Sequence, residues 1–240
     1  MNNQYPAVSA HSEIQQIFKD IFVVTGSVIM APGLQISRNM TIVRQGNKLT
    51  LISAVRLDEQ GLQALEKLGE INNIVKLGAY HLGQYNGIDD GFYIERYNAT
   101  LWALPAMEHN DGLQTDKELS PQQLPFDQAD LFIYESSDMP EALIVLQQEG
   151  GVVIAADSLQ NWVTADEYFS EKGAKLMQKG GFIQPANIGP QWRKVNRPSA
   201  EDFVKVKNLP FKHLLPSHGS PILNTAKEEI SATIKTLYGV

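Results

Sequence analysis

Two histidines and one aspartate follow apolar segments, at the positions where α/β proteins commonly place their chemistry. His81 and His218 each lie in a glycine-bearing turn directly after an apolar run, and Asp157 directly follows the run Val152–Ala156. If the three strand ends meet at one edge of a sheet, two imidazoles and one carboxylate come together, a set suited to one divalent ion. Spacing alone does not prove that they converge, so the metal site is a hypothesis.

The remaining histidines and the serines offer weaker signals. His11 and His213 are expected to be surface or structural groups. Ser217 and Ser136 lie near a histidine or an acid, but the chain has no Gly-x-Ser-x-Gly elbow, so a serine hydrolase is not expected. No Gly-x-Gly-x-x-Gly or Walker sequence follows a predicted strand, which argues against nucleotide binding by those modes.

Composition narrows the class of protein further. The 240 residues are 43% hydrophobic and 20% charged, as in ordinary soluble globular proteins, and the length allows one or two domains. The net charge of −7 and the pI of about 5.2 give no basic surface for phosphates, so nucleic acid is not an expected partner. Without cysteine, a metal would have to bind His, Asp, Glu or Asn.

Membrane insertion and secretion are not expected from the hydrophobic pattern. The longest apolar runs, Ile21–Val24 and Val152–Ala156, are far shorter than the roughly 18 residues that span a bilayer. The first 16 residues lack the basic start and the apolar stretch of a signal peptide. We therefore expect a cytoplasmic protein with no membrane partner.

The first half of the chain alternates strand and helix patterns, which predicts a sheet covered by crossover helices. Asp58 is expected to cap a helix that Gly69 ends, and a second helix is expected to run up to Tyr97. The predicted strands are Ile21–Thr25, Met40–Arg44, Leu49–Ala54, Ile71–Leu77 and Thr100–Leu104, and the capped helix is Glu59–Leu68. Residues 105–128 show no period and are expected to form a long surface loop.

Strand patterns return in the second half and are followed by helices. The turn Glu149-Gly150-Gly151 predicts a hairpin, and Asp202, three residues after Ser199, approaches a capping box. The predicted strands are Leu131–Tyr134, Ala142–Gln147, Val152–Ala156 and His213–Leu215. The predicted helices are Asp166–Gln178, Ser199–Lys207 and Asn224–Leu237, with chain breaks at Gly180-Gly181 and Pro185–Pro190.

Three stretches together resemble the metallo-β-lactamase-fold superfamily. The run GVVIAADSLQNW resembles its strand, Asp and Asn-aromatic region, and HLLPSHGSPI resembles its late Pro-x-His-Gly turn. The upstream run from NMTIVRQGNKLT to AYHLGQYNG has the element order of its first half. The chain looks closest to a divergent branch, the DUF4336-like proteins. This resemblance implies an α/β (α+β) fold, a four-layer αββα sandwich of two mixed sheets flanked by helices. It places an N-terminal extension at residues 1–18 and one domain at 19–240.

Carried onto this sequence, the family's metal motif is degenerate. The motif His-x-His-x-Asp-His falls on residues 81–86, so His81 matches while Gly83, Tyr85 and Asn86 take the other ligand positions. The mid-chain metal histidine of the family falls near Ser136.

The ligands that remain are His81, Asp157 and His218. In members with the full set, the first histidine serves one zinc, the late histidine serves the other, and the aspartate bridges both. Each metal would keep two protein ligands of the usual three or four, so weak binding is expected. Water activation needs a firmly held ion, and the resemblance therefore implies the fold more strongly than hydrolysis.

Two functional hypotheses from different classes stay open. The favoured one is a non-catalytic or much altered member that binds a small molecule or a protein in the old cleft. The alternative is a metal-dependent hydrolase of an ester, thioester or phosphoester with a reduced site for one zinc, iron or manganese ion; no cofactor is firmly predicted. Homo-oligomer formation is left open. Beyond the three ligands, the pocket candidates are Tyr85, Asn86, Asp89, Ser136 and Asn161, and the acids or histidine that could complete a metal site are Asp89, Asp90, Glu135 and His109.

Overall fold

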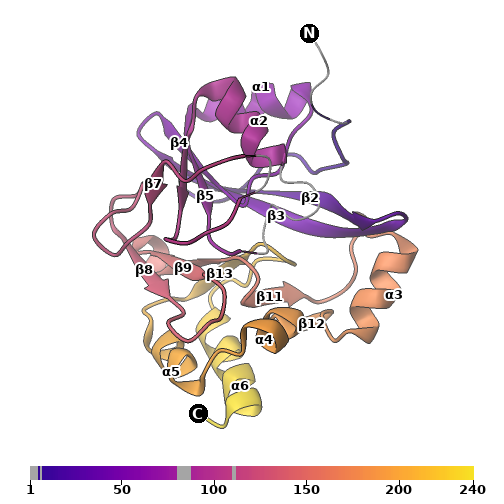
Figure 1. The fold of residues 1–240 in the computed structure, drawn as a ribbon, viewed down its shortest axis with the longest axis vertical. Helices are drawn as coiled ribbons and strands as arrows, with labels where there is room; N and C mark the ends of the chain where they lie inside the picture. The colour runs from indigo at the N-terminus through magenta and orange to yellow at the C-terminus, as the bar shows by residue number, and fades with distance from the viewer. Residues whose placement is uncertain (1–4, 6, 80–87, 110–111) are drawn as a thin grey trace.

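The computed structural model consists of two β-sheets that face each other, with helices on their outer sides (Figure 1). It describes residue 5 and residues 7–79, 88–109 and 112–240. The predicted four-layer arrangement of helices, two mixed sheets and helices is confirmed. Within those residues, no helix is long and apolar enough to span a membrane.

The N-terminal sheet combines an antiparallel meander with parallel strands. Its strands, adjacent in chain order, are β1 (Gln15–Phe18), β2 (Ile21–Ala31), β3 (Leu34–Gln45), β4 (Lys48–Ile52), β5 (Glu70–Lys76), β6 (Thr100–Ala103) and β7 (Lys117–Glu118). Pairing is antiparallel from β1 to β4 and parallel from β4 to β7. Parallel neighbours need crossovers, and α1 (Glu59–Leu68) and α2 (Ile88–Tyr97) provide those from β4 to β5 and from β5 to β6 on the outer face.

The C-terminal sheet has the order β13-β10-β9-β8, with only the β10–β13 pair parallel. Its strands are β8 (Ala129–Ile133), β9 (Ala142–Leu146), β10 (Val152–Ala155) and β13 (His213–Pro216), with the 3-10 turn η1 (Gln148–Gly150) between β9 and β10. A separate antiparallel pair joins β11 (Leu159–Trp162) and β12 (Gln184–Ile188). The remaining helices are α3 (Glu171–Lys179), α4 (Pro190–Asn196), α5 (Ala200–Asn208) and α6 (Ala226–Tyr238).

Apolar side chains from both sheets fill the space between them. Val75 and Ile52 of the first sheet and Ile144 and Ile154 of the second belong to this shared cluster and are almost fully buried. Each such side chain contributes about 1.5–3 kcal/mol on burial. Separate apolar clusters lie under α1 and α2 and under α4–α6, so both faces of each sheet are covered.

The chain backbone also joins the two sheets at one point. After β5, the amide of Ala79 donates to Pro140 O at 3.1 Å, and the amide of Ala142 donates to Leu77 O at 2.9 Å. Gly78 and Glu141 form the antiparallel bridge between these bonds. The ends of β5 and the start of β9 are therefore held side by side.

Several predicted boundaries were wrong for local reasons. The predicted helix Asp166–Gln178 begins only at Glu171, because Ser170 is its N-cap and accepts from the Gly173 amide at 3.0 Å. The predicted break Pro185–Pro190 contains β12 and the start of α4, in which Pro190 takes the first helical position, where proline is well tolerated. The region 105–128 is mostly irregular as predicted, but it includes the short strand β7.

The hairpin of β2 and β3 is much longer than predicted. The two strands stay paired from Ile21 and Val43 to Ala31 and Leu34, beyond the predicted strand ends at Thr25 and Met40. Its distal part includes the apolar residues Val28–Ala31 and the alternating pair Leu34 and Ile36, a strand pattern that the prediction did not use. Helix α3 covers the tip of this hairpin (Figure 1).

Candidate functional site

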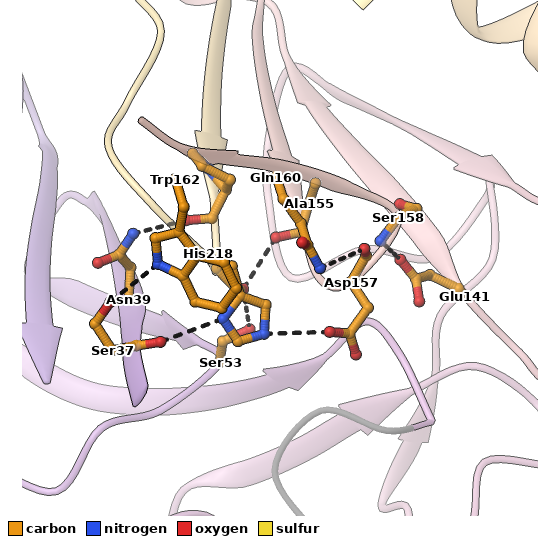
Figure 2. Close-up of polar contacts among 12 residues, drawn as sticks. Ser37, Asn39, Ser53, Glu141, Ala155, Asp157, Ser158, Gln160, Trp162 and His218 are labelled. Atoms are coloured by element: carbon orange, nitrogen blue, oxygen red, sulfur yellow. Dashed lines mark hydrogen bonds and ion pairs between the residues drawn. The ribbon is translucent and has the colours of Figure 1, made fainter. Parts of the chain in front are cut away.

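The carboxyl ends of β10 and β13 bring Asp157 and His218 together. The two strands are parallel, with Ala155 opposite Pro216, so the residues that follow them leave the sheet at the same edge. Asp157 Oδ1 lies 3.2 Å from His218 Nε2 (Figure 2). The Asp157 side chain is 16% exposed and the His218 side chain is 9% exposed, so both are mostly buried but reachable from solvent. The predicted convergence of these two strand ends is confirmed.

Residues from other elements fix the His218 ring in place. Its Nδ1 lies 3.4 Å from Ser37 O on β3, and its ring lies against Trp162, with 4.7 Å between the ring centroids. Trp162 Nε1 in turn donates to Ser37 Oγ at 3.0 Å. Both ring nitrogens of His218 thus face oxygen acceptors, and only the doubly protonated ring can donate to both.

The turn that carries His218 is anchored to the first sheet by β3. The Asn39 amide donates to Ser217 O at 2.8 Å, and Asn39 Nδ2 donates to Pro216 O at 2.9 Å. The Asn39 side chain is itself oriented because Thr25 Oγ1 donates to its Oδ1 at 2.8 Å. Hydrogen bonds from β3 therefore hold the turn of residues 216–217 against the first sheet. This contact restricts the position of the His218 imidazole.

A pair of buried hydroxyls adds a second anchor to the same turn. Ser217 Oγ donates to Ala155 O at 2.9 Å, so Ser53 Oγ, 2.7 Å away, is the donor in their mutual hydrogen bond. Ser53 follows β4 and adopts the left-handed region, with φ of 59°. A non-glycine residue there carries backbone strain, which the surrounding contacts sustain.

Glu141 is a buried acid behind Asp157. Its Oε1 accepts from the Ser158 amide at 2.5 Å and so holds the chain just after Asp157 (Figure 2). Burial, and then the nearby charge of Asp157, raise the pKa of the Glu141 carboxyl well above its usual range. This residue was not among the predicted site residues, because the segment YESSDMPEALIV shows no pattern that marks it.

Three predicted residues, His81, Tyr85 and Asn86, lie outside the described part of the chain. Of the acids proposed to complete a metal site, Asp89 pairs with the guanidinium of Arg38 and accepts from the Arg56 amide at 3.1 Å. Asp89 therefore links the start of α2 to the first sheet through these two contacts.

Ser136 and Asn161 hold backbone segments together. Ser136 Oγ donates to Asp202 Oδ2 at 2.6 Å and accepts from the Ser199 amide at 2.7 Å, which secures the start of α5. The expected capping box is thus replaced, because Asp202 binds Ser136. Asn161 donates to Ser220 O at 2.8 Å and accepts from the amide of residue 186 at 3.0 Å, next to the turn that carries His218.

The other candidates for completing a metal site have protein partners or are deeply buried. Glu135 forms an exposed ion pair with Lys205 at 2.5 Å, and His109 lies 2.8 Å from Thr115 Oγ1. Asp90, in the first turn of α2, is buried, and its burial raises the pKa of its carboxyl to about 7 even though the charge of Lys76 lowers it.

The donors among the described residues do not by themselves make a zinc site. Within residues 5, 7–79, 88–109 and 112–240, no group of three or more His, Asp or Glu side chains could hold a metal ion. Asp157 and His218 supply two donors, whereas catalytic zinc sites use about three protein ligands and structural ones four. Their 3.2 Å separation suits a direct hydrogen bond.

Comparison with known proteins agrees with this architecture. No family model and no curated protein matches the chain. Among solved structures, the chain is similar to the DIM-1 metallo-β-lactamase exposed to ceftazidime, with 12% identity, a TM-score of 0.64 and coverage of 96% of this chain and 99% of the other.

Two further solved structures show the same likeness. FIM-1 from Pseudomonas aeruginosa in its mono-zinc form shares 13% identity, with a TM-score of 0.62 and coverage of 96% and 97%. The metallo-β-lactamase from Hirschia baltica shares 14% identity, with a TM-score of 0.60 and coverage of 92% and 97%. The chain therefore has the metallo-β-lactamase fold.

Proposed function

We propose that this chain is an altered member of the metallo-β-lactamase fold that binds a small molecule at the Asp157–His218 pair. The observation that carries the proposal is this pair itself. A carboxylate and an imidazole lie 3.2 Å apart at the ends of β10 and β13, and both side chains are partly exposed to solvent. Ser37, Asn39 and Trp162 hold the imidazole in place before any ligand arrives. Such preorganisation lowers the entropic cost of binding.

The polar atoms that the pair presents to solvent indicate which class of ligand it could bind. Asp157 is the more exposed partner and offers carboxylate oxygens, which accept hydrogen bonds. A ligand with hydroxyl, amine or amide donors therefore suits this edge. The loss of charged ligands from the family motif at Gly83, Tyr85 and Asn86 supports binding without a metal pair.

The second candidate function is a hydrolase of an ester, thioester or phosphoester with one metal ion. One observation favours it: His218 directs Nδ1 to a backbone carbonyl, as metal-binding histidines usually do with their second nitrogen. Two ligands about 2 Å from a common ion would also lie about as far apart as Asp157 Oδ1 and His218 Nε2 do.

Metal analysis of the purified full chain separates the two candidates. We expect well under one zinc, iron or manganese per chain by mass spectrometry, and a melting temperature that changes little with added Zn²⁺ or EDTA. Near-stoichiometric metal that is lost in His218→Gln would refute the proposal and favour the hydrolase. His213→Gln is the matched control, since His213 is a buried histidine on β13 whose ring contacts backbone groups away from the pair.

A ligand screen then tests binding directly. We expect small molecules with hydroxyl or amine groups to raise the melting temperature of the parent chain and of His213→Gln. The same compounds should have no effect on Asp157→Asn and His218→Gln. Equal shifts in all four proteins would place the ligand elsewhere and contradict the proposal.

A further inference from the structure

Glu141 is the acid at which the second sheet meets the end of β5. The residue is 1% exposed, directly precedes β9 and forms an antiparallel bridge with Gly78. A Cβ on residue 78 would lie 2.8 Å from Glu141 Oε2 and 3.1 Å from the Ala156 Cβ. Glycine therefore leaves the space that the Glu141 carboxyl occupies between the two sheets.

The Glu141 carboxyl reaches from this junction to the backbone that carries Asp157. Its Oε1 accepts from the Ser158 amide at 2.5 Å (Figure 2). Burial raises the pKa of this carboxyl, and hydrogen bonds from the Ser158 side chain and from the amides of Ser158 and Asp157 oppose that rise. The carboxyl thus holds the turn at the residue whose side chain faces His218 and at the residue that follows it.

Both members of the candidate pair are in this way attached to the first sheet. The His218 turn is bonded to β3 through the amide and the side chain of Asn39. The Asp157 turn is attached through Glu141, which bridges to Gly78 just after β5. Since one sheet holds both turns, the 3.2 Å between Asp157 Oδ1 and His218 Nε2 depends on both attachments.

We propose that Glu141 is a positioning residue that sets the contact between Asp157 and His218 by tying the Asp157 turn to the first sheet. It acts through the backbone of residues 157 and 158. Supporting hydrogen bonds of this kind keep a site within the narrow range of geometries that preorganised binding needs. The inference deepens the proposed function and rests on it for the ligand, whereas the contact itself is measured in the protein alone.

NMR of the imidazole nitrogens in the ¹⁵N-labelled full chain, without ligand and at one pH, tests this role. The ¹⁵N shift of His218 Nε2 responds to its contact with Asp157, and the signal is assigned by its loss in His218→Gln. Asp157→Ala gives the change expected when the contact is absent. Glu141→Ala should move the signal in the same direction. Glu141→Gln should keep the parent signal, because its amide oxygen can still accept from the Ser158 amide.

A second variant at the junction tests the same role without touching the acid. Gly78→Ala should move the His218 signal as Glu141→Ala does, because the added methyl group displaces the carboxyl. This variant serves as the test if Glu141→Ala does not fold. A parent-like signal in the folded variant would overturn the inference.

Val206→Ala is the control for a general loss of stability. Val206 is fully buried on α5, so its truncation lowers the melting temperature and should leave the His218 signal unchanged. A change in Val206→Ala equal to that in Glu141→Ala would also overturn the inference. Since the signal is recorded without ligand, a failed ligand screen counts against the proposed function alone.

Discussion

Asp90 should make the stability of the protein depend on pH in a direction opposite to that of most carboxylates. Its carboxyl is fully buried in the first turn of α2, and burial raises its pKa from 3.8 to about 7. The charge of Asp89 raises this pKa further, whereas the charges of Lys76 and Arg38 lower it. Between pH 4 and 7 the folded chain therefore holds a proton that the unfolded chain has lost.

The size of the effect follows from this difference in pKa. The pKa rises from 3.8 to about 7, and at 1.36 kcal/mol for each step of one in pKa this difference gives a ceiling of about 4 kcal/mol. Because the folded-state pKa is the higher one, this contribution is fully present below about pH 4 and is lost as the pH rises through 7. The free energy of unfolding should therefore fall over this range by up to about 4 kcal/mol through Asp90 alone.

Urea unfolding at several pH values from 4 to 8 measures this contribution. Other groups titrate too, so the quantity to follow is the difference in unfolding free energy between the parent chain and Asp90→Asn. That difference should decrease with pH by up to about 1.4 kcal/mol per unit. Asp127→Asn, at an exposed carboxylate, is the matched control. Parallel curves for the parent chain and Asp90→Asn would refute the reasoning.

Two further predictions concern the contact between the two sheets at Ser53 and the packing of α3 against the β2–β3 hairpin at Gly173. Ser53→Ala should cost about 1–2 kcal/mol in urea unfolding, because the hydroxyl that donates to Ser217 is lost. Ser53→Gly should be about 1 kcal/mol more stable than Ser53→Ala, because it relieves the left-handed strain; equal stabilities would contradict that strain. Gly173→Ala should destabilise the chain by about 1–3 kcal/mol although alanine favours helices, because a Cβ there would collide with Gln35 O. A melting temperature at or above that of the parent would show that α3 can move away from the hairpin at no cost.

The sequence was sufficient to predict the layers and part of the candidate site. Most strands have apolar runs bounded by turn residues, and Asp157 and His218 follow such runs directly. Position after a strand suggested that the two residues could meet, and they do so because their strands are parallel neighbours, with 3.2 Å between Asp157 Oδ1 and His218 Nε2. The resemblance in motif order led to the same fold that the solved structures show.

The groups that support His218 could not be predicted, because each depends on long-range pairing. Ser37 and Asn39 reach the site only through the register of the long β2–β3 hairpin, and both precede the predicted strand start at Met40. The contact of Trp162 with His218 depends on the course of β11, which pairs with β12 outside the two main sheets. Glu141 becomes notable only once its burial is known.

The Gly78–Glu141 bridge joins the two sheets, so the exchange of the two amide protons beside it depends on whether the sheets separate. The protons of Ala79 and Ala142 are bonded across the bridge, to Pro140 O and Leu77 O. Amides inside β5 or β9 become exposed only when a sheet itself opens, whereas these two become exposed as soon as the halves move apart. Their exchange with deuterated solvent, compared with that of amides inside the strands, would reveal whether the halves of the molecule come apart before either one unfolds.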